Sequence, residues 1–146
     1  AKYFKRIPKI IIVEPDRADC VLQSIKSRKL KKIKIKKESI MGGMSCNEMS
    51  YIPWQILKKA SNHCVSVSDR NVAKTVALLK DKKLSKNSII GGECSAPGII
   101  SLVSVCNDLN TKKLIKLNEK SNVLIIGCEG NADVKLYKQL LSKGRK

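Results

Sequence analysis

The chain is poor in the residues that build stacking platforms, metal centres and histidine-based catalytic sites. Only 3% of its 146 residues are aromatic, and His63 is the single histidine. Base-stacking platforms are therefore nearly absent, and valine, leucine and isoleucine must fill the core. His63 opens a predicted strand, and nothing in the sequence places a cysteine thiol against its ring. The sequence therefore favours a structural histidine over a Cys–His nucleophile.

Long apolar runs are also missing, because lysine and arginine interrupt each of them. No stretch approaches the length of a membrane span, so we expect no membrane partner. The first nine residues contain no apolar signal-peptide core. The chain begins with Ala1 rather than methionine, which indicates either a start inside a longer reading frame or processing.

Six cysteines are present, but none forms a CxxC pair. They are Cys20, Cys46, Cys64, Cys94, Cys106 and Cys128. A structural zinc site wants close ligand pairs, so we predict no metal. A disulfide scaffold does not suit a chain this rich in apolar strand patterns. We expect mostly buried free thiols and a cytoplasmic location, where thiols stay reduced.

Acidic residues are few: 12 stand against 30 lysines and arginines, giving a net charge of +18. Such a charge invites a nucleic-acid hypothesis. Lysine outnumbers arginine 25 to 5, however, whereas base and phosphate recognition favours the arginine fork. We attribute the positive charge to a genome-wide drift toward lysine, isoleucine and asparagine codons rather than to a selected basic surface. A basic nucleic-acid-binding domain remains an alternative.

The apolar pattern alternates between the periods of strands and helices. This predicts one α/β domain over residues 1–146, a mostly parallel sheet flanked by helices. We predict strands at 8–14, 63–67, 88–91 and 122–127, and helices at 19–28, 51–60, 68–79, 97–105, 111–117 and 133–141. Asp16 or Asp19 is the expected cap of the first helix, and Asp133 that of the last.

A lysine-rich stretch, residues 29–37, follows the first predicted helix. Its partial alternation of apolar and basic residues fits an exposed edge strand or a loop, and its charge suits an edge. Phosphate binding is an alternative to a solvated edge.

Four turns border the predicted strands and helices, at 14–19, 39–46, 91–98 and 127–133. In a parallel sheet such turns gather at the edge where ligands bind. They bring glycines, serines, cysteines and carboxylates to that edge. No GxGxxG or Walker motif is present, so the nucleotide motifs are not supported.

Six short motifs occur in a characteristic order. They are Val13-Glu14-Pro15, Ile40-Met41-Gly42-Gly43 leading to Cys46, Trp54-Gln55-Ile56-Leu57, Val65-Ser66-Val67-Ser68-Asp69, Gly92-Glu93-Cys94-Ser95, and Cys128-Glu129-Gly130 leading to Asp133 and Tyr137. Together they resemble the C-terminal portion of diaminopropionate ammonia-lyase. That enzyme depends on pyridoxal phosphate (PLP) and has the tryptophan-synthase-β-like fold. The family has a glycine-bearing segment where this chain has Lys31–Lys37.

The resemblance implies a lyase that converts 2,3-diaminopropionate to pyruvate and ammonia by α,β-elimination. It assigns Cys128, Gly43, Glu93 and Ser95 to PLP binding, with Cys128 facing the pyridine nitrogen. It also suggests that Cys20 lies near Cys46.

The family's Schiff-base lysine, catalytic aspartates and phosphate loop would precede residue 1. We therefore expect no catalytic residue here and no activity of the chain alone. Its partners would be a small amino-acid substrate and a missing N-terminal half or a homodimer partner. A decayed, non-catalytic remnant is the alternative.

Overall fold

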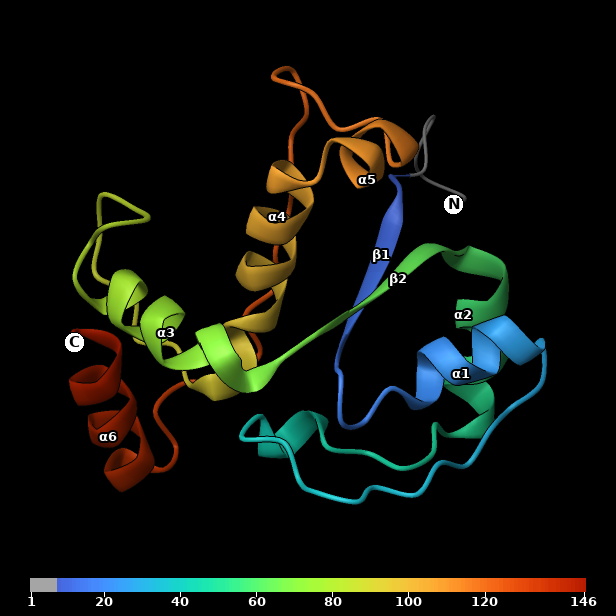
Figure 1. Ribbon diagram of the computed structural model, residues 1–146, viewed down its shortest axis with the longest axis horizontal. Helices are drawn as coiled ribbons and strands as arrows, with labels where there is room; N and C mark the ends of the chain where they lie inside the picture. The colour runs from blue at the N-terminus through green and yellow to red at the C-terminus, as the bar shows by residue number, and fades with distance from the viewer. Residues whose placement is uncertain (1–7) are drawn as a thin grey trace.

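The structure is a computed structural model that describes residues 8–146, and it has the predicted α/β class (Figure 1). Two parallel strands are flanked by helices. The strands are β1 (Ile10–Pro15) and β2 (Ser61–Val67), and the α-helices are α1 (Cys20–Ser27), α2 (Tyr51–Ala60), α3 (Val72–Lys80), α4 (Pro97–Asn107), α5 (Leu109–Leu114) and α6 (Val134–Gly144). Three 3-10 turns are η1 (Gly42–Met44), η2 (Asp69–Asn71) and η3 (Glu93–Ser95).

The strands run side by side, with Val13 opposite Val65 and Pro15 opposite Val67. The backbone N–H of Asp16 continues the ladder by donating to the carbonyl of Val67 at 2.9 Å. The turns after both strands therefore leave the sheet at the same edge, as parallel pairing requires.

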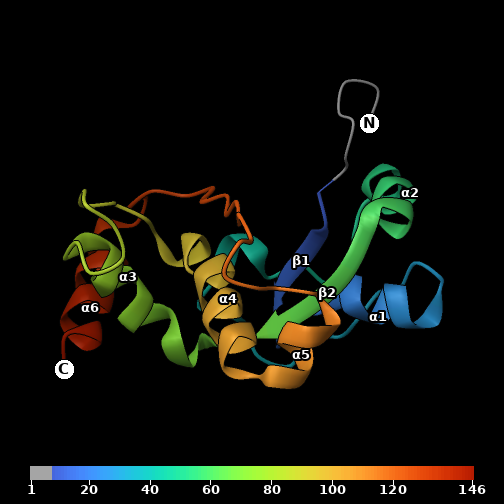
Figure 2. The same cartoon turned by 90° about the horizontal axis from the view of Figure 1, so that it is seen from above.

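The core lies where α3, α4 and α6 meet the end of β2, while α1 and α2 lie at the other end of the molecule (Figures 1 and 2). Its members include Met41, Val72, Val76, Ile100 and Leu140, all with relative exposures of 6% or less. The predicted inner stripe of the last helix is confirmed. Tyr137 and Leu140 are buried, and Leu136 and Leu141 pack against the cluster.

Two predicted strands are not formed. Residues 88–91 and 122–127 have no strand structure in the described part of the chain. Leu124 and Ile126 are 86% and 79% exposed. An apolar run becomes a strand only when a neighbouring strand satisfies its backbone groups, and within residues 8–146 these two runs have none.

The lysine-rich stretch is a loop, not an edge strand, and its lysines are exposed. The helices agree more closely with expectation, and α2 spans the predicted residues. The Asp133 side chain accepts from the Leu136 N–H at 2.9 Å, as predicted for a helix cap. Among residues 8–146, no helix is long and apolar enough to cross a bilayer.

The predicted cap of α1 is confirmed in its position, Asp19, but not in its hydrogen bond. Asp19 stands at the cap position without a side-chain capping bond. Glu14 takes that role from the end of β1, since its carboxylate accepts from the N–H groups of Val21 at 2.9 Å and Leu22 at 2.8 Å. Glu14 is only 6% exposed, and burial raises the pKa of its carboxyl above the ordinary value. The Val-Glu-Pro motif therefore joins strand β1 to helix α1.

Candidate functional site

Three turns from distant parts of the sequence meet at one place. A Cβ added at Gly43 would lie 3.3 Å from the Cys94 Sγ, which puts η1 against η3. The Cys128 Sγ lies 3.9 Å from the Cys94 carbonyl oxygen. The structure thus brings Gly43, the Glu93–Ser95 turn and Cys128 together, although Cys128 follows an irregular segment and not a strand. We call these residues, with Glu129, the three-turn site.

Glu129 holds its own turn against the turn at residues 92–95 by hydrogen bonds, a role that the sequence did not reveal. Its carboxylate Oε2 accepts from the Cys94 N–H at 3.1 Å. Its carbonyl accepts from the Gly92 N–H at 3.1 Å and from the Ser95 hydroxyl. The Ser95 Oγ in turn accepts from the Glu129 N–H at 3.3 Å. The buried Ser95 hydroxyl is therefore occupied in holding the chain at Glu129.

Gly92 is required by this close approach. A Cβ there would lie 2.2 Å from the carbonyl oxygen of Gly130, a distance at which atoms overlap. The glycine pair at 91–92 was the only sequence signal of such contact.

The Cys94 thiol is protonated in this setting. Burial, followed by the hydrogen bond and negative charge of Glu129, raises the pKa of Cys94 to about 12. Ligand atoms of Glu93, Cys94 and Glu129 lie within 4.8 Å of one another, a spacing compatible with a metal ion. The hydrogen bond from the Cys94 N–H to Glu129 accounts for the closeness of those two residues.

The remaining turns are tied to the same sheet edge by Asp69, which ends the serine-rich strand motif. Its carboxylate accepts from the Ser39 hydroxyl at 2.5 Å, the Ile40 N–H at 3.1 Å and Arg17 at 2.6 Å. The turn that follows β1 and the Ser39–Cys46 turn thus meet at the end of β2. The gathering of turns expected from a parallel sheet is present.

Cys20 and Cys46 are both free thiols. Burial raises the pKa of Cys20 to about 11, and the negative charge of Glu14 adds to the shift. That Cys20 lies near Cys46 stays a prediction. No disulfide joins the cysteines of residues 8–146. Cys46, Cys106 and Cys128 are exposed, whereas mostly buried thiols were expected.

Comparison with known proteins gives the same assignment from sequence and from structure. No protein-family model matches the chain. Diaminopropionate ammonia-lyase of Escherichia coli (strain K12) is 31% identical over 138 residues, covering 92% of this chain and 35% of that enzyme. The chain thus spans about a third of the length of the curated relatives it matches.

Comparison with solved structures gives the same enzyme as the sequence comparison. The E. coli enzyme in complex with an aminoacrylate-PLP azomethine reaction intermediate superposes with a TM-score of 0.78 at 31% identity, over 94% of this chain and 35% of that one. The complex of the E. coli enzyme with D-serine superposes with a TM-score of 0.79 at 31% identity, over 94% of this chain and 34% of that one. Maize serine racemase, at 18% identity, shares the fold alone, with a TM-score of 0.71 over 92% of this chain and 39% of that one. By sequence and fold, the chain corresponds to the C-terminal portion of diaminopropionate ammonia-lyase, a PLP-dependent enzyme.

Proposed function

We propose that the chain forms one wall of a PLP site in a lyase that eliminates ammonia from 2,3-diaminopropionate. The observation that carries this proposal is the three-turn site. Gly43, Cys94 and Cys128 meet there in a chain 31% identical to a lyase whose crystal structure holds a PLP azomethine. The D-serine complex of that enzyme supports an amino-acid substrate.

The residues of the site fit the ring end of PLP and not its phosphate end. Glu93 and Glu129 would repel a phosphate, whereas a neutral thiol at Cys128 can meet a pyridine nitrogen without fixing a proton on it. When bound, PLP supplies a sink for the electrons left at the substrate Cα. A neutral partner makes that sink weaker, which favours loss of a β-leaving group over transamination.

The chain's own residues have separate roles in this wall. Cys128 is exposed and would face the ring nitrogen of PLP, and Gly43 and Glu93 would border the ring edge. Ser95 is a positioning residue, because its hydroxyl holds Glu129 and so fixes Cys128 next to it.

The site is completed by a segment that carries the Schiff-base lysine. We infer that residues 1–146 act as one α/β unit of a larger fold, completed by a missing N-terminal half or, as the alternative, by a homodimer partner. The exposed run at Val123, Leu124 and Ile126 supports this, because a strand from that segment would cover it.

A hybrid enzyme tests the proposal. The chain replaces the matching C-terminal third of the E. coli lyase, and Cys128→Ala is compared with Cys106→Ala, an exposed cysteine on α4. We expect Cys128→Ala to weaken PLP binding or slow pyruvate release at least tenfold, with Cys106→Ala unchanged. Equal behaviour of the two variants would remove Cys128 from the site.

A further inference from the structure

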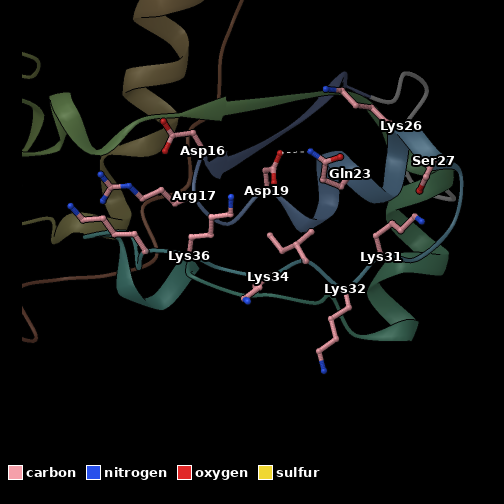
Figure 3. Close-up of a pocket in the computed structure, with 12 residues that line it drawn as sticks. Asp16, Arg17, Asp19, Gln23, Lys26, Ser27, Lys31, Lys32, Lys34 and Lys36 are labelled. Atoms are coloured by element: carbon pink, nitrogen blue, oxygen red, sulfur yellow. Dashed lines mark hydrogen bonds between the residues drawn. The ribbon is translucent and has the colours of Figure 1, made fainter.

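A hollow lined by lysines lies away from the three-turn site, between α1 and the lysine-rich loop of residues 29–37. Figure 3 shows Lys31, Lys32, Lys34 and Lys36 spread along the loop, with Lys26 on α1. The hollow measures about 830 Å³. Its cationic lining residues are Arg17, Lys26, Lys31, Lys32, Lys34, Lys36 and Lys37, against Asp16 and Asp19.

The loop is anchored and not free. Leu30, Ile33 and Ile35 are half-buried, while the lysines between them are exposed. The Lys31 N–H donates to the Ser24 Oγ at 2.9 Å, and the Ile33 N–H donates to the Asn47 carbonyl at 2.8 Å. The loop thus holds Lys32, Lys34 and Lys36 exposed in place before any partner arrives, which reduces the ordering cost of binding.

Most of these lysines form no ion pair with a carboxylate among residues 8–146. Within residues 8–146, Lys32 alone among them pairs with a carboxylate, that of Glu48, at 3.9 Å on the surface. Arg17 is held by Asp69 at 2.6 Å, and Asp19 accepts from Gln23 at 2.8 Å. The unpaired lysines, Lys26, Lys31, Lys34, Lys36 and Lys37, outnumber Asp16 and Asp19 and make the hollow positively charged, so it attracts a polyanion.

We propose that this hollow and the lysine-rich loop bind the phosphate backbone of duplex nucleic acid without sequence preference. Arginine is favoured where a base or a phosphate is bound by a bidentate fork, but lysine still binds phosphate as a point charge. The lining contains no aromatic side chain on which an unpaired base could stack, so a duplex fits better than a single strand. The shortage of arginine and aromatics argues against base readout but leaves backbone binding intact.

The test is fluorescence anisotropy of the 146-residue chain with a 20-base-pair DNA duplex at 50 to 200 mM salt. Five unpaired lysines predict a slope of log K against log[salt] of about −4 to −5. The triple variant K34Q/K36Q/K37Q should reduce the slope to about −2 and the affinity at 50 mM salt at least tenfold. K34R/K36R/K37R keeps the charge and should keep the binding.

The matched control, K135Q/K138Q/K143Q, removes the same charge from exposed positions of α6 at the opposite end of the molecule (Figure 1). We expect it to change affinity less than about threefold, since α6 lies outside the hollow. Equal losses in both glutamine triples would show that net charge alone drives binding. A wild-type slope shallower than about −2, preference for single-stranded DNA, or stronger binding to anionic phospholipid vesicles than to the duplex would each overturn the proposal.

Discussion

Replacing Glu14 tests the assignment of the α1 cap. Glu14→Ala removes the acceptors of two N–H groups, Val21 in a buried position and Leu22 in a partly buried one. A buried donor without an acceptor costs about 1 to 3 kcal/mol. Burying the Glu14 carboxylate also costs free energy, which is why its pKa is raised. Glu14→Ala removes this burial cost, and that offsets part of the loss. We expect Glu14→Ala to lower the free energy of unfolding by about 2 kcal/mol.

Glu14→Gln keeps one acceptor but turns an amide donor toward the other N–H, so its loss should be about half as large. Asp19→Ala is the matched control at the cap position. It should change the free energy of unfolding by less than about 0.5 kcal/mol, because Asp19 makes no capping bond. Urea unfolding followed by far-UV circular dichroism measures all three.

The contribution of Glu14 to stability changes with pH in the opposite direction to that of an ordinary paired carboxylate. Since folding raises the pKa of Glu14 above 4.5, its contribution is complete below that value and is lost as pH rises through the folded pKa. The difference in free energy of unfolding between wild type and Glu14→Ala should therefore become smaller as pH increases from about 4.5. A larger loss for Asp19→Ala than for Glu14→Ala would refute the capping assignment.

Three further outcomes follow from contacts of single residues. Gly92→Ala should destabilise the chain by about 1 to 3 kcal/mol, because its Cβ would overlap the Gly130 carbonyl, whereas Gly42→Ala, with nothing within 4 Å, should have little effect on thermal unfolding. Tyr137→Phe should stabilise the chain by about 1 kcal/mol, because the buried Tyr137 hydroxyl has no partner among the described residues; a lower unfolding midpoint would contradict this. Iodoacetamide at pH 8 should alkylate Cys46, Cys106 and Cys128 before Cys94, whose thiol is buried with a pKa raised to about 12, and mass spectrometry showing equal rates would contradict it.

The sequence predicted those elements that their own residues stabilise. Helix α2 spans the predicted residues, and α6 has its cap at Asp133 and its inner stripe at Tyr137 and Leu140. The paired strands β1 and β2 were also predicted, since each provides the neighbour that the other needs. Residues 122–127 have an equally strong apolar pattern but find no partner strand in the described chain. A local pattern cannot state whether a partner exists.

The candidate site was predicted as a meeting of turns, but the bonds that hold it together were not. Glu129 and Ser95 are separated by 34 residues, and no local pattern reveals that one fastens the other. Glu14 was visible as part of a motif, yet its capping role depends on how β1 turns into α1. Backbone contacts across such distances appear only once the chain is folded.

Pyruvate release by the hybrid enzyme tests the proposed function most directly. The 146-residue chain alone, mixed with PLP and diaminopropionate, should release no pyruvate above free PLP, because none of its 25 lysines lies in a matching Schiff-base context. The folded hybrid, with the E. coli portion carrying the PLP lysine, should bind PLP and release pyruvate. Turnover by the chain alone, or a folded hybrid that neither binds PLP nor releases pyruvate, would contradict the account.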